Sequence, residues 1–124
     1  MKNNDIKITI KDKKQVLNEF ADTLAKARKG EIIYKHKELS FENVYTLRKF
    51  LTEKRIELLH IIKHDNPGSM YELAKIANRD FKSVTTDIAI LKELNLVSLE
   101  KIKDGRIRVK PKVNFNKINV EITI

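Results

Sequence analysis

The strongest structural signal of the chain lies in residues 69–111, which read SMYELAKIANRDFKSVTTDIAILKELNLVSLEKIKDGRIRVKP. It opens on a capping box: the Ser69 hydroxyl can accept a hydrogen bond from the amide of Glu72, while the Glu72 carboxylate reaches back to the amide of Ser69. This pattern predicts a short helix that begins at Met70. Asn78, which tolerates a left-handed backbone, then predicts a tight turn at the end of this helix.

A second helix is expected at residues 81–94, with Asp80 as its N-cap and Asn95 where glycine usually ends a helix. Apolar residues at helical spacing predict its buried stripe: Phe81, Val84, Ile88, Leu91 and Leu94. The other side of its first turns is polar or small: Lys82, Ser83, Thr85, Thr86 and Ala89. A helix that buries the apolar stripe turns these side chains outward.

Residues 96–110 alternate around Asp104-Gly105, a pair that favours a two-residue hairpin turn. Such a turn sets two pairs of cations opposite each other on one face: Lys103 with Arg106, and Lys101 with Arg108. Like charges that face one another destabilise a hairpin, so the arrangement indicates an anionic partner, with phosphate the obvious one. Lysine on an edge strand also prevents aggregation, which is the alternative interpretation. Strict alternation places Leu99 on the cationic face too, and a bulge near Glu100 would resolve this.

A short helix, a tight turn, a polar-faced helix and a cationic hairpin are, in that order, the elements of a winged helix-turn-helix, a fold that reads DNA. The residues expected to face base edges in the major groove are Lys82, Ser83, Thr85 and Thr86. Tyr71, Lys75 and the first amides of the short helix are expected to meet phosphate. The hairpin cations expected on the DNA backbone or in the minor groove are Lys101, Lys103, Arg106 and Arg108. Arg79 either binds phosphate or pairs with a carboxylate such as Asp80 or Glu72.

Composition points to the same class of partner. The chain has 124 residues with 26 Lys and Arg against 17 Asp and Glu, and its net charge of +9 favours nucleic acid or another anionic surface. Residues 101–117 hold seven cations and one anion, so the excess collects at the hairpin and beyond it. The chain has no cysteine, which excludes disulfides and thiolate metal sites. An alternating N-terminus and the lack of a long apolar run predict a cytoplasmic protein without a signal peptide or membrane span.

The ends of the chain predict further elements. Ile6, Ile8 and Ile10 alternate with polar residues, as in a strand with one buried face. Asp12 can cap a helix that Gly30 ends, and residues 32–34 suggest a short strand. Ser40 is expected to cap a brief helical turn through Leu47, and Thr52 to cap a helix over residues 52–65. The resulting α+β fold has three parts: an accessory strand-helix-strand in 1–40, the winged helix-turn-helix in 41–112, and a C-terminal strand in 113–124 that joins the accessory element.

The C-terminal segment alternates regularly, with Ile118, Val120, Ile122 and Ile124 as its apolar residues. An isolated strand would leave its backbone and its apolar face unsatisfied, so it needs a partner. Residues 6–10 form the strand of matching character, and the two pair either within one chain or across two chains. We expect the accessory element to form a homodimer that brings two DNA-reading surfaces together, with an intrachain sheet in a monomer as the alternative.

Four segments resemble the MarR-like winged-helix regulators: LTEKRIELL at 51–59, YELA at 71–74, VTTDI at 84–88 and LKELNLV at 91–97. With Ser40-Phe41-Glu42 and the N-terminal strand and helix, the chain also resembles small prokaryotic DNA-binding proteins, some of them proposed antitoxins encoded beside a toxin. The resemblance implies the winged-helix fold and nucleic-acid binding, and it suggests a toxin partner. Together with the residues above, it leads us to expect a sequence-specific regulator of transcription, acting as a repressor on double-stranded DNA. The alternative is an antitoxin-like module that holds a toxin protein, and both hold if the protein represses its own operon.

Catalysis has little support in the sequence. His60 and His64 lie four residues apart on an expected helix, a spacing that can place two imidazoles on one metal. No Glu lies between them as in a zinc protease, and no further His or Cys is close in sequence. With three glycines, the chain has no loop that would cradle phosphates. We therefore expect no enzyme, no metal and no cofactor.

Overall fold

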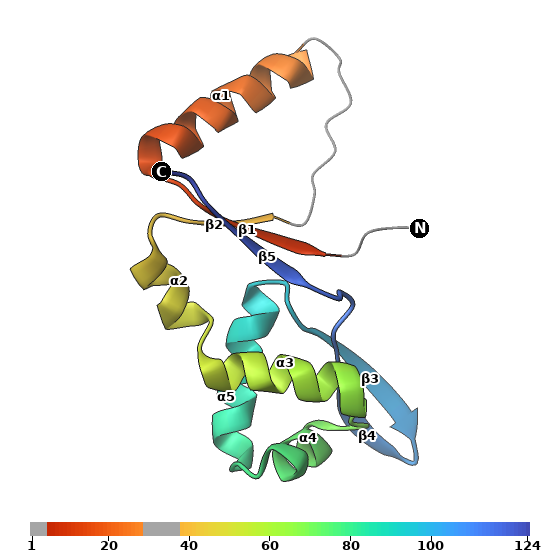
Figure 1. Cartoon of the computed structure of the whole chain (residues 1–124). Coiled ribbons are helices and arrows are strands. Elements are labelled where there is room, and N and C mark those ends of the chain that lie inside the picture. The colour runs from red at the N-terminus through yellow and green to blue at the C-terminus, as the bar shows by residue number, and fades with distance from the viewer. Residues whose placement is uncertain (1–4, 29–37) are drawn as a thin grey trace. The chain divides into compact units, whose positions relative to one another are not determined.

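The computed structural model of the chain describes residues 5–28 and 38–124, and it is an α+β protein (Figure 1). The chain divides into two compact units. Unit 1 takes residues 1–48 and 115–124, and unit 2 takes residues 49–114. Unit 2 is thus continuous in sequence, whereas unit 1 is assembled from both ends of the chain.

Unit 1 contains a parallel sheet with strand order β2-β1-β5, formed by β2 (Glu38–Phe41), β1 (Ile6–Ile10) and β5 (Ile118–Ile122). The central strand β1 has four buried residues: Ile6, Ile8 and Ile10 on one face and Thr9 on the other. Its remaining residue, Lys7, is exposed. The Thr9 hydroxyl is hydrogen-bonded to Glu38 Oε1 at 3.1 Å and to Ser40 Oγ at 2.9 Å, which satisfies this buried polar group.

Strands β1 and β5 pair within one chain, with Ile6 opposite Ile118 and Ile10 opposite Ile122. The sequence left open whether these two strands pair within one chain or across two chains, and the structure shows the intrachain pairing. Helix α1 (Lys13–Arg28) follows β1 as expected. The helix end predicted at Gly30 and the strand predicted at residues 32–34 lie outside the described residues.

The cap predicted at Ser40 is wrong. Ser40 lies in β2, where its hydroxyl is hydrogen-bonded to Thr9, and helix α2 begins only at Val44 and runs to Phe50. Asn43 performs the capping, since its side-chain oxygen accepts from the amide and the hydroxyl of Thr46, both at 2.8 Å. The capping side chain is therefore the one directly before the helix.

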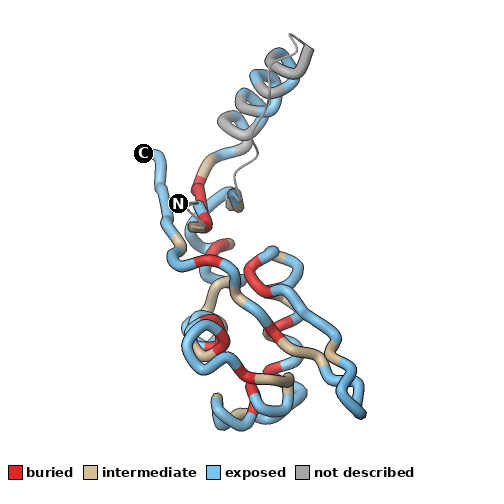
Figure 2. Tube along the Cα trace, turned by 90° about the vertical axis from the view of Figure 1, so that its right-hand side faces the viewer, coloured by how far each residue is buried: buried red, intermediate tan, exposed pale blue. Residues whose placement is uncertain are grey.

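Unit 2 contains α3 (Glu53–Asp65), α4 (Met70–Ala77), α5 (Phe81–Glu93) and a hairpin of β3 (Ser98–Asp104) and β4 (Arg106–Lys112). Its core takes one side of each helix, and the residues of this unit exposed by less than 2% include Leu58, Pro67, Leu73, Val84, Ile88, Leu91 and Pro111. In Figure 2 buried segments alternate with exposed ones along this unit, while the tip of the hairpin is exposed on both strands.

The helix ends of unit 2 follow the sequence closely. Thr52, Ser69 and Asp80 cap α3, α4 and α5, and Asn78 and Asn95 adopt the left-handed backbone, with φ of 55° and 60°. One detail of the capping box differs from the prediction. Glu72 Oε2 accepts from the amide of Gly68 at 2.9 Å rather than from Ser69, whose backbone is extended at φ −159° and ψ 168°.

The predicted hairpin register is wrong by one residue. Asp104 pairs with Arg106, so that Gly105 alone forms the tip with φ 89°, and the pairing continues without a bulge to Ser98 and Lys112. The predicted two-residue turn would need a positive φ at Asp104 as well as at Gly105, and only Gly105 has one. Lys103 consequently faces Ile107 and not a second cation.

The corrected register changes both faces of the hairpin. Leu99 faces the buried Pro111, on the face that also carries Lys101 and Lys103, while Arg106 and Arg108 lie on the opposite face. No cross-strand pair of the hairpin joins two cations. The direct opposition of like charges expected from the sequence is therefore absent from this hairpin, and the bulge expected near Glu100 does not form.

Candidate functional site

The outward face of α5 carries most of the side chains that the sequence placed there. Lys82, Thr85, Thr86 and Ala89 are exposed, while Val84 and Ile88 are buried on the other side. Ser83 is half-buried and is engaged in the cap: its amide and its hydroxyl donate to the Asp80 carboxylate at 2.9 and 2.7 Å. These hydrogen bonds, the hydroxyl's first, hold the pKa of Asp80 below its usual range. Ser83 therefore stabilises the start of α5 and leaves the outward surface to its neighbours.

The two threonines use their hydroxyl protons within the helix. Thr85 Oγ1 donates to the carbonyl of Phe81 at 2.7 Å, and Thr86 Oγ1 donates to the carbonyl of Lys82 at 3.0 Å. Each hydroxyl keeps its capacity to accept, and each threonine keeps its methyl group. The outward face of α5 thus offers acceptors and methyl groups, with the Lys82 ammonium as a donor.

Tyr71 of α4 joins the start of α5 to the hairpin tip. Its ring, which is 71% exposed, stacks on Phe81 with centroids 4.2 Å apart and planes 11° apart. Tyr71 and Ser69 also form one wall of an open groove of about 930 Å³, whose other wall is residues 104–108 of the hairpin. The starts of α4 and α5 and the hairpin tip therefore form one continuous surface of unit 2.

The stacking corrects one assignment. Phe81 was expected in the buried stripe of the second helix, but it is 39% exposed. It occupies the first position of α5, where its ring covers Tyr71 instead of entering the core. Lys75 lies further along α4 and is exposed, as its predicted role requires.

The hairpin cations are not equivalent. Arg108 is paired with Asp104 at 2.7 Å, and Lys112 is paired with Glu100, which lowers the pKa of Glu100 through a hydrogen bond and through its charge. Lys101, Lys103 and Arg106 form no ion pair within residues 5–28 and 38–124. Lys110, the sixth cation of the hairpin, faces Glu100 across the strands. Lys101, Lys103 and Arg106, which we call the free hairpin cations, leave uncompensated positive charge on both faces of the tip.

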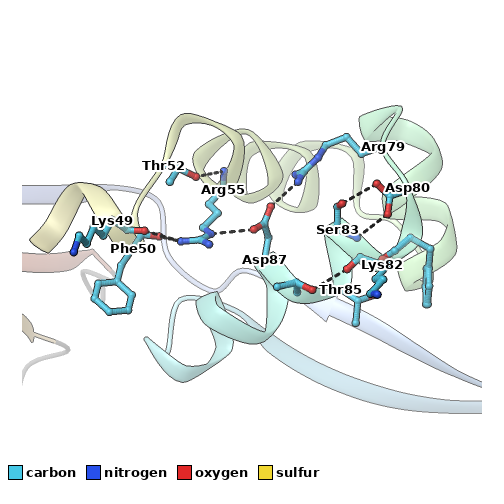
Figure 3. A network of polar contacts seen from close by, with 12 residues as sticks. Lys49, Phe50, Thr52, Arg55, Arg79, Asp80, Lys82, Ser83, Thr85 and Asp87 are labelled. Carbon is cyan, nitrogen blue, oxygen red and sulfur yellow. Dashed lines mark hydrogen bonds and ion pairs between the residues drawn. The ribbon is translucent and has the colours of Figure 1, made fainter.

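Arg79 belongs to a charged network inside unit 2 (Figure 3). Its Nη2 donates to Asp87 Oδ2 at 2.7 Å, and Arg55 Nε donates to Asp87 Oδ1 at 3.1 Å. Arg55 also donates through Nη1 to the carbonyls of Lys49 and Phe50, at 2.9 and 2.8 Å. The three charged side chains are only 14 to 18% exposed. We call Arg55, Asp87 and Arg79 the guanidinium clamp.

The clamp decides between the roles left open for Arg79. Its ion-pair partner is Asp87 rather than Asp80 or Glu72, and its Nη1 is buried without an acceptor, so the guanidinium is engaged inside unit 2. The clamp joins α3 and the turn before α5 to the middle of α5, which fixes the rotation of α5 about its axis. Sequence reasoning missed Asp87 and Arg55. The one local signal for this network was the position of Asp87, a carboxylate that lies in the sequence between the buried Val84 and Ile88.

The histidines form no site of their own in the structure. The rings of His60 and His64 stack with centroids 6.2 Å apart on the exposed side of α3. Among the described residues, no three His, Cys, Asp or Glu side chains gather as metal ligands would. In the same part of the chain, no helix has the length and apolar character needed to cross a bilayer.

The fold and the surface define a small α+β protein with a helical unit that ends in a charged hairpin. Residues 50–120 match the HVO_A0114 family, and because this span covers more than half of the chain, the protein belongs to that family. No curated protein and no solved structure matches the chain.

Proposed function

We propose that the protein is a winged helix-turn-helix regulator of transcription, of the MarR-like type, that binds double-stranded DNA sequence-specifically in the cytoplasm and acts as a repressor. Helices α4 and α5 form the helix-turn-helix, and the β3-β4 hairpin is the wing. The observation that carries the proposal is the position of Tyr71, whose ring contacts the start of α5 and lines the groove against the hairpin tip. A reading helix and a wing must share one surface to engage neighbouring parts of one duplex.

The chemistry of each part suits a different feature of DNA. The acceptors and methyl groups of Thr85 and Thr86 complement the amino groups of adenine or cytosine and the methyl group of thymine in the major groove. We assign phosphate contacts to the amides at the start of α4, together with Tyr71 and Lys75. We no longer count Arg79 among the DNA contacts. Its role is to position α5 through the guanidinium clamp.

The corrected register redefines how the wing contacts DNA. The free hairpin cations lie on opposite faces of the ribbon, with Lys101 and Lys103 on one and Arg106 on the other. A ribbon of this kind presents charge on both faces near its tip, which suits insertion along a groove whose two walls are phosphate strands. Arg108 adds a smaller contribution because its charge is shared with Asp104.

The test is the salt dependence of DNA binding. Binding to the DNA upstream of the protein's own coding region, and to a shuffled sequence of equal length, is measured by fluorescence anisotropy over a range of salt. Each phosphate contact contributes about 0.9 to the slope of log affinity against log salt, so Lys103→Ala should lower the slope by about one unit. Lys63→Ala, on the exposed side of α3, makes the same charge change and should leave the slope unaltered.

Two outcomes would contradict the proposal. An unchanged slope after replacing all three free hairpin cations would exclude the wing from the interface. Equal affinity for the upstream and shuffled DNA would exclude sequence-specific regulation.

One observation favours a second candidate function, an antitoxin-like hold on a toxin protein. Helix α1 exposes Leu17, Phe20 and Leu24, which follow each other at helical spacing and form an apolar stripe. If this stripe holds a toxin, expressing the neighbouring open reading frame alone should stop growth. Co-expression of the wild-type chain should restore growth, and co-expression of Phe20→Glu should not.

A further inference from the structure

Strand β5 is an edge strand. In the order β2-β1-β5 it pairs with β1 on one side, and no strand among the described residues pairs with its other side. The outer N–H and C=O groups of an edge strand form a ready template for a strand of another chain. The free edge of β5 is therefore a place where a partner can extend the sheet.

The apolar face of the sheet continues to this edge and is uncovered there. Val120 and Ile122 pair with Ile8 and Ile10, so the four side chains lie on one face. Ile8 and Ile10 are 1% and 7% exposed, whereas Val120 and Ile122 are 48% and 51% exposed. The apolar side chains are therefore buried on β1 and half exposed on the adjacent β5. This difference is expected when a further strand beside β5 is missing.

We propose that the missing strand is β5 of a second copy, paired antiparallel about a two-fold axis at Val120. In an antiparallel pair, side chains directly opposite each other share a face, so apolar residues must oppose apolar residues. An axis at Val120 sets Ile118 opposite Ile122 of the partner subunit and uses all five residues of β5.

Charge excludes the axis at the next residue. With the axis at Val120, Asn119 lies opposite Glu121 of the partner subunit, and no two carboxylates face each other. An axis one residue later would set Glu121 opposite Glu121 of the partner subunit, and like charges in opposite positions destabilise a sheet. Lys7 of β1, which pairs with Glu121 at 3.1 Å, already balances this carboxylate within each copy. The second copy is therefore complementary to the edge in hydrogen bonding, apolar pattern and charge.

The consequence for DNA binding rests on the proposed function, but the interface itself does not. Joining two copies gives a two-fold protein, which matches two half-sites related by the same symmetry. The interface can be tested without any DNA. A failure of the interface is therefore distinguishable from a failure of the DNA-binding proposal.

Cysteine cross-linking tests the axis directly, because the chain has no cysteine of its own. A residue on the two-fold axis lies opposite its own copy, with Cα atoms about 4.5 to 5.5 Å apart, which is within disulfide range. Val120→Cys should therefore form a disulfide-linked dimer under mild oxidation, seen on a non-reducing gel, at least ten times faster than two controls.

The controls separate this register from chance. Glu121→Cys, the neighbouring position, would have its two copies roughly 8 Å apart, which is beyond disulfide range. Ile107→Cys lies on the hairpin, is 70% exposed and reports random collision. Cross-linking of either control as fast as Val120→Cys would overturn the proposal.

Sedimentation of the wild-type protein completes the test. The full chain should be a dimer at tens of micromolar, and Val120→Lys, which places two ammonium groups at the axis, should be a monomer. Circular dichroism should show an unchanged fold for Val120→Lys, since the wild-type side chain is half exposed. A wild-type monomer, or a wild-type dimer that survives Val120→Lys, would show that β5 does not join two copies.

Discussion

Removing the Asp87 carboxylate should destabilise unit 2 strongly, because two guanidinium groups depend on it. Arg79 would lose the one acceptor that the structure gives its guanidinium, and its Nη1 is already buried without a partner. Arg55 would keep the carbonyls of Lys49 and Phe50. Deleting one partner of a fully buried ion pair costs about 3 to 5 kcal/mol. Since these side chains are 14 to 18% exposed, we expect about 2 to 3 kcal/mol for Asp87→Ala, after allowing for solvent screening.

The measurement is urea unfolding followed by helical circular dichroism. A loss of this size corresponds to a fall in Tm of roughly 6 to 12 °C for a chain of this length. Asp87→Asn, which keeps the shape and one acceptor oxygen but gives up the charge, should lie between the wild type and Asp87→Ala. Glu93→Ala removes an exposed acid from the same helix and should change the stability by less than about 0.5 kcal/mol.

The clamp also predicts a coupling that simple loss of stability would not produce. In a double-mutant cycle, Arg79→Met and Asp87→Ala should be strongly non-additive, because either change alone breaks the same contact. A loss below about 0.5 kcal/mol for Asp87→Ala, or additive effects in the cycle, would refute a stabilising role for the clamp.

Three further outcomes can be measured. Thr86→Ala should alter base preference at one position of a selected binding site by about 1 to 3 kcal/mol, and leave affinity for shuffled DNA unchanged; an unaltered selected site would count against a reading role for α5. Tyr71→Ala should lower the free energy of unfolding by about 0.5 to 1.5 kcal/mol through the lost stacking on Phe81. It should also weaken binding to every DNA tested. Full retention of binding would show that the groove beside Tyr71 does not contact DNA. Because the pKa of Asp80 is lowered in the folded protein, its ionised carboxylate stabilises α5 at pH values above the ordinary aspartate pKa of about 3.9, and this contribution is lost as the pH falls through the folded-state pKa. Asp80→Asn should therefore reduce the fall in unfolding free energy at acid pH. An unchanged pH dependence would show that this cap does not titrate.

The parts of the structure that follow from the sequence are those set by neighbours along the chain. Ser69, Asp80 and Thr52 each cap a helix through an amide three residues away, so the capping residue and the helix start are readable together. Asn78 ends α4 for the same local reason, through its own backbone conformation. The exposed face of α5 follows from the periodicity that buries its other side.

The features that sequence reasoning missed depend on contacts between distant residues or on one torsion angle. Asp87 contacts Arg55 from another helix, and no spacing rule links two positions 32 residues apart. The hairpin register depends on whether one or two residues form the turn. A two-residue type I′ turn needs a positive φ at Asp104 as well as at Gly105, so the φ of Asp104, which is not positive, decides this. Because each shift by one residue changes the face of every side chain on one strand relative to its partner, this single angle redistributed all the hairpin cations.

The order of the strands in the parallel sheet has a consequence for the nascent chain. Strand β1 is synthesised before unit 2, yet β5, one of its two neighbours, follows the whole of unit 2. Unit 2 is contiguous and can fold as soon as it leaves the ribosome, whereas the isoleucines of β1 must wait for their last neighbour with part of their apolar surface open. During translation the edge of β1 that pairs with β5 therefore stays open until β5 has emerged, and ribosome pausing before residue 118 should lengthen that interval.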